Sequence, residues 1–226
     1  MTIHTLNSER LRGSLAVAVG GRWSLPALCT LLTSLCLGCS GLSKPYPAQQ
    51  FFAVPVPPGT VSTSDQRQGV VRVEGVRIAS PFDQRTLVYR LPDDRFEFDY
   101  YRQFAADPAD LLTGEAVQAL AASGRFATVL DPGSAANARY WLEASVQEMY
   151  GDFRDRARPA AVMRARFFLI ENSVASSTVV GDWTFEVTVP LVRDSADEVA
   201  PALGRAWGEL LDRLVKASGS TTLAQR

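Results

Sequence analysis

Histidine and cysteine are scarce in this 226-residue chain: the single histidine is His4, and all three cysteines lie within the first 39 residues. If that segment is a leader that is cut before Cys39, the mature chain keeps no histidine and only one cysteine, its first residue. Cys/His zinc sites, internal disulfides and histidine-based catalytic triads are then excluded together. We therefore expect no catalytic residue, no metal or cofactor site, and no enzymatic activity.

Excess positive charge is also absent. The chain carries 23 basic and 24 acidic residues, for a formal net charge of −1, and its only lysines are Lys44 and Lys216. Nucleic-acid binding through a strongly basic surface is therefore not expected, and neither is a lysine-rich patch for anionic lipids. A glycine-rich phosphate loop is missing too, since the pair Gly20-Gly21 precedes the apolar run of the leader.

The N-terminus has the order of a secretory signal. Residues 1–22 carry three arginines against one glutamate, and an apolar run over 23–37 follows. At about 1.5 Å per residue this run reaches roughly 22 Å, short of the ~30 Å hydrocarbon core. We therefore expect a signal peptide over 1–38 and no permanent membrane span.

Leu37-Gly38-Cys39 resembles the bacterial lipobox, which implies that Cys39 is the lipid-attachment residue and becomes an acylated N-terminus. The copy departs from the usual pattern, because Cys36 stands where leucine is common and Leu37 where a small residue is common. The alternative is an ordinary cysteine within an apolar signal. Ser40 follows in place of aspartate, which under the enterobacterial sorting rule implies transfer to the outer membrane. Several acyl chains would hold the protein firmly in a bilayer.

The mature chain is expected to be a lipidated tether over 39–48, one α+β domain over 49–217, and a C-terminal tail over 218–226. The tether lacks periodicity and contains two prolines. Within the domain, alternating apolar residues predict six to seven strands of a mainly antiparallel sheet. The strand signals lie at Phe51–Val56, Val70–Ile78 (with a bulge at Gly75), Thr86–Arg90, Arg95–Tyr100 and Phe126–Leu130, and around Tyr140–Val146, Met163–Leu169 and Val179–Val189.

Two amphipathic helices are expected to cover one face of this sheet. The first has Asp107 as N-cap, Pro108 at its first position and Gly124 as C-cap. The second starts with a capping box formed by Ser195 and Glu198 and ends at Gly219. Its apolar stripe comprises Val199, Leu203, Ala206, Trp207, Leu210 and Leu214.

Three groups of residues invite a functional interpretation, and each has a structural alternative that we favour. The acidic stretch could supply paired carboxylates or metal ligands, but it suits a solvated turn and strand face. The arginine cluster could bind phosphate or an acidic partner, yet Asp152 and Asp155 interleave with it and favour a self-neutralised hairpin. The tryptophans could line a lipid groove, but core packing is favoured. The groups are Asp93, Asp94, Glu97 and Asp99; Arg154, Arg156, Arg158, Arg164 and Arg166; and Trp141, Trp183 and Trp207.

The order of motifs from Phe51 to Val215 resembles the auxiliary lipoproteins of ABC-type transport systems, the family typified by paraquat-inducible protein C. The resemblance is carried by an aromatic first strand, a valine-rich second strand, an aromatic strand before a proline-started helix, and an alanine-rich final helix. The motifs are Phe51-Phe52-Ala53-Val54, Val71-Arg-Val-Glu-Gly-Val-Arg-Ile78, Leu87-Val-Tyr-Arg90, Tyr100-Tyr101-Arg102-Gln103-Phe104, Ser123-Gly-Arg-Phe-Ala-Thr-Val129, and Ala138-Arg-Tyr-Trp-Leu-Glu143. Phe104 stands where tryptophan is common in the family.

This resemblance implies a non-catalytic outer-membrane lipoprotein that faces the periplasm. Its partners would be an MCE-domain protein and an ABC transporter permease and ATPase, which together move lipid or another hydrophobic solute between membranes. A homo-oligomer is a further hypothesis. The alternative is a periplasm-facing binding or assembly lipoprotein that is similar to the N-terminal domain of TolB-like proteins and is not coupled to a transporter.

Overall fold

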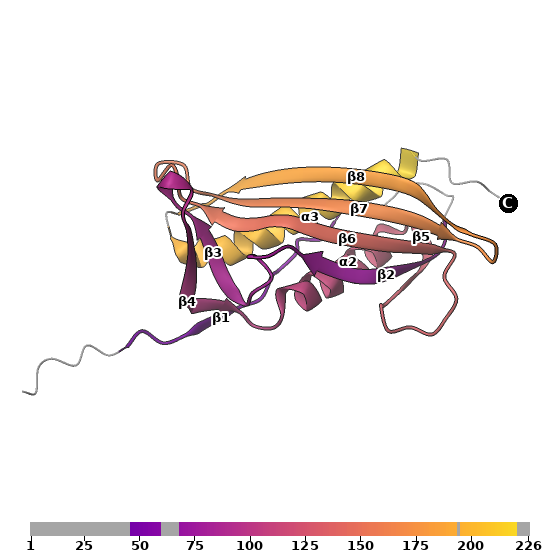
Figure 1. Ribbon diagram of the computed structural model, residues 1–226, viewed down its shortest axis with the longest axis horizontal. Helices are drawn as coiled ribbons and strands as arrows, with labels where there is room; N and C mark the ends of the chain where they lie inside the picture. The colour runs from indigo at the N-terminus through magenta and orange to yellow at the C-terminus, as the bar shows by residue number, and fades with distance from the viewer. Residues whose placement is uncertain (1–45, 60–67, 194, 221–226) are drawn as a thin grey trace, which may run out of the picture. The chain divides into compact units, whose positions relative to one another are not determined.

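Three long strands dominate the sheet in the computed structural model of the chain, which describes residues 46–59, 68–193 and 195–220. β6 (Tyr140–Asp152), β7 (Ala160–Asn172) and β8 (Ser177–Pro190) pair antiparallel over nearly their whole lengths (Figure 1). Apolar and polar residues alternate along them, so that Phe167 is fully buried on one face while Arg166 reaches solvent on the other. The predicted one-sided burial of these strands is confirmed.

The other strands add parallel pairings. β2 (Gln68–Ile78) runs parallel to both β6 and β5 (Phe126–Leu130). β3 (Thr86–Arg90) pairs parallel with the end of β6 and antiparallel with β4 (Phe96–Phe104), and β1 (Gln50–Phe52) lies parallel to β4. The result is an eight-stranded open mixed sheet with the order β1-β4-β3-β6-β2-β5, extended from β6 by β7 and β8. The α+β prediction is confirmed, with more strands than the six to seven expected.

Four register shifts interrupt the strand pairings: one between β2 and β6, one between β3 and β4 where β4 bulges from Asp99 to Gln103, one between β6 and β7, and one between β7 and β8. The register of β2 against β6 shifts between Val73 and Val76, and Gly75 within this bulge has a φ of 94°, which glycine adopts without steric cost. This confirms the predicted bulge. The last of the four shifts lies in β8, where Gly181 pairs with Leu169 but Val179 pairs with Ile170. The alternation of Val179 with Trp183, Phe185, Val187 and Val189 predicts that all five share the buried face, but Val179 is 54% exposed, so the prediction was wrong for this residue.

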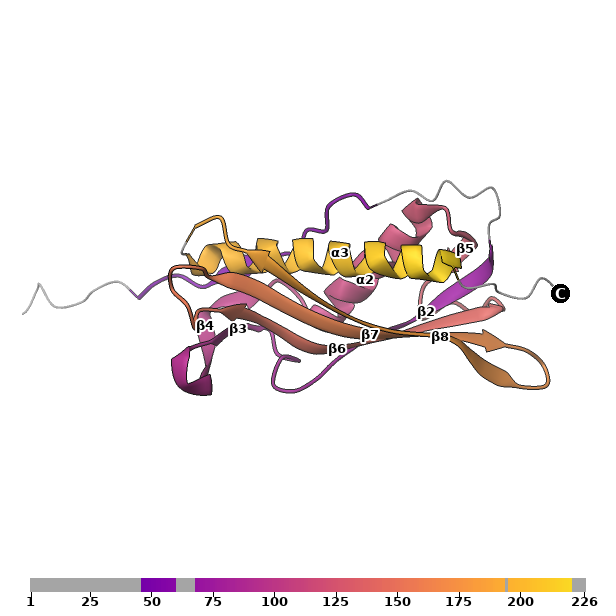
Figure 2. The ribbon, with the colours of Figure 1, turned by 90° about the horizontal axis from the view of Figure 1, so that it is seen from above.

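α2 (Pro108–Ser123) and α3 (Val199–Ser220) lie on the same face of the sheet (Figure 2). α2 packs against β2 and β5, and α3 packs against β7 and β8. Trp207 of α3 joins the layers: its ring stacks on Phe167 of β7 at 5.8 Å, and its Nε1 donates a hydrogen bond of 3.1 Å to the carbonyl of Leu112 in α2. The predicted covering of one face by two helices is therefore present.

The two helices begin differently. Asp107 caps α2 by accepting a hydrogen bond from the backbone of Ala109, and Gly124 ends it in the left-handed conformation, as predicted. The capping box of the second helix does not form, because Ser195 accepts from Asp197 while Glu198 pairs with Arg193.

A short 3-10 turn, Ala196–Glu198, precedes α3. It moves the start of the helix so that Pro201 falls in the first turn, where its missing N–H removes no intrahelical hydrogen bond. The helix also runs one residue beyond the predicted end at Gly219.

The first strand is shorter than predicted. It ends at Phe52, and the chain then leaves the sheet to cross α3, with Val54 buried and Pro55 lying against Gly204. The alternation of Phe51–Val56 suits a strand, but β4 ends at Phe104, the partner of Phe52, and so offers no pairing to the residues that follow.

Candidate functional site

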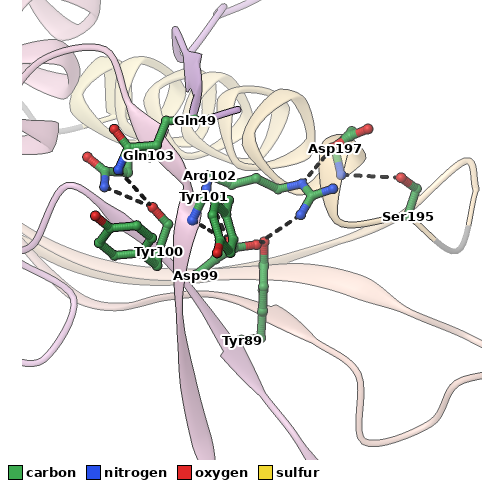
Figure 3. Close-up of polar contacts among 9 residues, drawn as sticks. All are labelled: Gln49, Tyr89, Asp99, Tyr100, Tyr101, Arg102, Gln103, Ser195 and Asp197. Carbon is green, nitrogen blue, oxygen red and sulfur yellow. Dashed lines mark hydrogen bonds and ion pairs between the residues drawn. The ribbon is translucent and has the colours of Figure 1, made fainter. Parts of the chain in front are cut away.

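The N-terminal segment enters the folded domain at one end of the sheet, where β1, β4 and the start of α3 meet (Figure 3). The side-chain amides of Gln49 and Gln103 both donate hydrogen bonds to the carbonyl oxygen of Tyr100, at 3.4 and 3.1 Å. Gln50 of β1 is in register with Arg102 of β4. Gln49 and Gln50, which follow the segment from Cys39, thus hydrogen-bond and pair with the outer edge of β4.

A polar network at the same end connects β3, β4 and α3 (Figure 3). The hydroxyl of Tyr89 donates to Oδ2 of Asp99 at 2.7 Å, and the backbone amides of Tyr101 and Arg102 donate to Oδ1 at 2.9 and 3.1 Å. Arg102 donates from Nη1 to Asp99 at 3.2 Å and from Nε to Asp197 at 2.6 Å. One arginine therefore links the bulged part of β4 to the turn that starts α3.

The environment shifts the pKa values of these groups in opposite directions. Burial, reinforced by the hydrogen bond to Asp99, raises the pKa of Tyr89 far above its ordinary value. Burial also works to raise the pKa of Asp99, but hydrogen bonds from Tyr89, from the amide of Tyr101 and from Arg102 outweigh it and lower that pKa. The hydrogen bond to Asp197 raises the pKa of Arg102. At neutral pH the network therefore holds a neutral phenol, a carboxylate and a guanidinium.

The acidic stretch divides into two environments. Asp93 and Asp94 lie exposed in the turn Pro92–Asp94, and Asp94 pairs with Arg90 at 2.6 Å, as expected for a solvated turn. Asp99 instead faces the network, with a side chain only 11% exposed. The prediction of a solvated face was therefore wrong for Asp99, because its partners come from distant parts of the chain. Within the described residues, no group of three or more His, Cys, Asp or Glu is arranged to hold a metal.

The arginine cluster is largely neutralised by neighbouring carboxylates. Arg154 pairs with Asp152 at 2.6 Å, and Arg158 pairs with Asp155 at 2.9 Å, both at the β6–β7 turn. On the open sheet face Arg166 pairs with Asp182 of β8 at 2.7 Å. The predicted self-neutralised hairpin is confirmed for Arg154 and Arg158, whereas Arg166 is neutralised by a residue of the neighbouring strand that the prediction did not include.

The tryptophans do not line a common groove. Trp207 is completely buried in the core, which confirms the core prediction for this residue. Trp183 is half-buried and borders a narrow apolar cavity with Leu120, Leu142 and Leu214. Trp141 is half-buried on the other face of the sheet, in register with Ile170.

A surface feature that the sequence did not suggest lies beside the entry of the N-terminal segment. Among the described residues from Pro47 onward, the exposed aromatic side chains are Phe51, Phe96, Phe98 and Tyr100, which we call the β4 aromatic patch. Three of them alternate along β4 with Glu97 and Asp99, so they leave the strand on the side opposite the polar network. The alternation of Phe96, Phe98 and Tyr100 was a visible signal, but the same pattern equally describes a buried strand face.

Cys39 and the predicted signal peptide lie outside the described residues. The described helices include none with the length and apolarity needed to cross a membrane.

Comparisons with known proteins place the chain in a family. The crystal structure of a Xanthomonas campestris protein assigned to the family model DUF330 matches with a TM-score of 0.66 and 20% identity, covering 77% of this chain and 100% of the other. A second crystal structure, of an uncharacterized protein, matches with a TM-score of 0.58 and 15% identity, covering 75% and 97%. These likenesses show the fold. No curated protein matches the sequence.

The family model described as the ABC-type transport auxiliary lipoprotein component matches residues 52–215, nearly the whole folded domain. This agrees with the resemblance drawn from the order of the motifs. The chain belongs to the ABC-type transport auxiliary lipoprotein component family.

Proposed function

We propose that this protein is a non-catalytic outer-membrane lipoprotein, anchored through Cys39 and facing the periplasm, that docks an MCE-domain assembly of an ABC-type lipid transport system. The observation that carries the proposal is the family match over residues 52–215. Three acyl chains at ~0.8 kcal/mol per buried CH₂ would hold Cys39 in a bilayer against dissociation.

The chemistry of the described domain supports an accessory role. The carboxylate of Asp99 already accepts four hydrogen bonds, and the phenol of Tyr89 is neutral at physiological pH. This network joins structural elements and leaves no activated nucleophile or base in it. ATP would be hydrolysed by a separate subunit of the transporter.

Affinity capture from cross-linked membranes tests the proposal. The wild-type protein should recover an MCE-domain protein, and Cys39→Ala should lose it, because the unanchored chain no longer concentrates at the membrane. Cys36→Leu is the matched control: it changes a neighbouring cysteine but keeps the lipid acceptor and restores the usual lipobox residue. Recovery of other envelope proteins with no MCE-domain protein would instead favour the uncoupled binding or assembly lipoprotein.

Homo-oligomerisation is part of the same proposal, since a ring of copies could match a ring of MCE domains. Native mass spectrometry of the protein in detergent should show a defined oligomer. Monomers alone at micromolar concentration would contradict this part of the proposal and leave the rest intact.

A further inference from the structure

We infer that the β4 aromatic patch contacts the surface of the lipid bilayer and orients the domain on it; this inference rests on the proposed lipidation of Cys39. Several aromatic side chains of the patch are exposed: Phe51 is 57% exposed, Phe98 43% and Tyr100 67%. Tyrosine is enriched at membrane–water interfaces, and phenylalanine is common among the apolar side chains by which peripheral proteins enter the headgroup boundary. Figure 1 shows β1 and β4 together at one end of the sheet.

The length of the chain between the anchor and the patch supports a membrane partner. Nine residues lie between Cys39 and Gln49, and the ten steps from one to the other, at no more than about 3.6 Å each, span at most about 36 Å. Gln49 is itself bonded to the carbonyl of Tyr100 within the patch. The anchor therefore holds the patch near the bilayer at a high effective concentration, which a soluble partner does not have.

The unpaired outer edge of β4 limits how far the patch can penetrate the bilayer. From Phe96 to Tyr100 the strand pairs with β3 on one side, while β1 begins pairing on the other side only at Arg102. Within the described residues the outer backbone groups of this stretch have no strand partner. Unpaired N–H and C=O groups are excluded from hydrocarbon, so the rings reach the headgroup region while the backbone stays hydrated.

Charge plays a secondary part in this contact. The guanidinium of Arg85 lies 5.8 Å from the ring centre of Phe51 but donates to the carbonyls of Phe104 and Ala105, and that of Arg90 lies 5.8 Å from the ring centre of Phe96. Arg90 is also paired with Asp94. The contact should therefore form on zwitterionic vesicles and depend little on salt.

Single-cysteine labelling tests the inference on the full processed lipoprotein. If Cys39 is lipidated, its sulfur is blocked, so a cysteine introduced as Phe98→Cys or Tyr100→Cys is the only labelling site in the mature chain. Each variant is labelled with an environment-sensitive fluorophore and reconstituted into phosphatidylcholine vesicles that contain headgroup-region quencher lipids. Val174→Cys, in the fully exposed β7–β8 turn, is the matched control.

Labels at positions 98 and 100 should show blue-shifted emission and lose about half of their intensity to the shallow quencher, as expected for interfacial residues. The label at position 174 should remain unquenched. Equal, unquenched emission at all three positions in vesicle-bound protein would overturn the inference. So would protection of position 98 only after an MCE-domain protein is added, or only at high protein-to-lipid ratio, which would assign the patch to a protein partner or a second copy.

The wild-type chain separates this inference from the proposed function. Wild-type protein should take up no label and should float with the vesicles. A labelled wild-type chain that fails to float would show that Cys39 is not lipidated, whereas a floating chain with unquenched labels would contradict only the membrane contact of the patch.

Discussion

Gly204 of α3 lies so close to Pro55 that a Cβ atom built on the glycine would overlap the carbonyl oxygen of Pro55. A second glycine one turn later, Gly208, faces Val56 and Pro57 at 3.1 and 3.3 Å from its own Cβ position. The segment that connects the first strand to the rest of the domain thus crosses α3 in contact with its backbone.

Gly204→Ala should therefore destabilise the domain, by about 1–3 kcal/mol as for other overpacked sites. Gly114→Ala in α2 is the control, because open space surrounds that position. It should stabilise by about 0.5–1 kcal/mol, the ordinary gain of replacing glycine within a helix. Denaturant unfolding of both variants measures the difference, and equal stabilisation would show that the crossing segment does not press on α3.

The hydrogen bond between Tyr89 and Asp99 should contribute measurably to stability. Tyr89→Phe removes the hydroxyl from a partly buried carboxylate and should cost about 1–3 kcal/mol. Tyr100→Phe removes a hydroxyl from a side chain that is 67% exposed and should stay within about 0.5 kcal/mol of wild type. A double-mutant cycle with Asp99→Asn gives the coupling energy, and a value near zero would contradict the network.

The lowered pKa of Asp99 predicts acid sensitivity. Because the unfolded chain binds a proton at a higher pH than the folded chain does, the stability from this carboxylate is complete above its ordinary pKa of about 3.9 and declines as pH falls through the folded pKa. Unfolding free energies at successive pH values below neutrality should therefore decline more steeply for wild type than for Asp99→Asn. Parallel profiles would show that Asp99 is not held ionised by its partners.

Trp207 should behave as a core residue and not as part of a lipid site. Trp207→Ala removes a fully buried ring together with its hydrogen bond to Leu112 and should cost about 3–5 kcal/mol. Trp141→Ala, on the open face of the sheet, should cost clearly less. Thermal unfolding distinguishes the two variants, and a small effect at Trp207 would reopen the groove interpretation.

Local signals in the sequence predicted the elements that local interactions stabilise. Asp107, Pro108 and Gly124 bracket α2 because caps act within a few residues, and the alternation around Phe167 predicted the buried face of β7 for the same reason. The shortened first strand and the shifted start of the second helix depend instead on contacts with distant residues. The periodicity of apolar residues does not specify these long-range contacts, so it cannot locate the end of the first strand or the start of the second helix.

The pairing of strands and the candidate site were less accessible from the sequence. Whether β2 runs parallel to β5 and β6 depends on how the chain crosses over between the strands. An alternating pattern of apolar and polar residues does not specify the direction of the neighbouring strand. The ion pair between Arg102 and Asp197 joins residues 95 positions apart, and the side chain of Asp99 turns inward only because these partners meet it. The β4 aromatic patch is likewise exposed because both helices cover the opposite face of the sheet, and the alternation within β4 alone does not determine which face they cover.

Intact-mass spectrometry of the protein purified from membranes tests the anchoring that the proposed function requires. The account predicts a mature chain that begins at Cys39 and carries the mass of a diacylglyceryl group and an amide-linked acyl chain, and this mass should disappear in Cys39→Ala. A mature chain with an unmodified Cys39, or one that begins at another residue, would contradict the account.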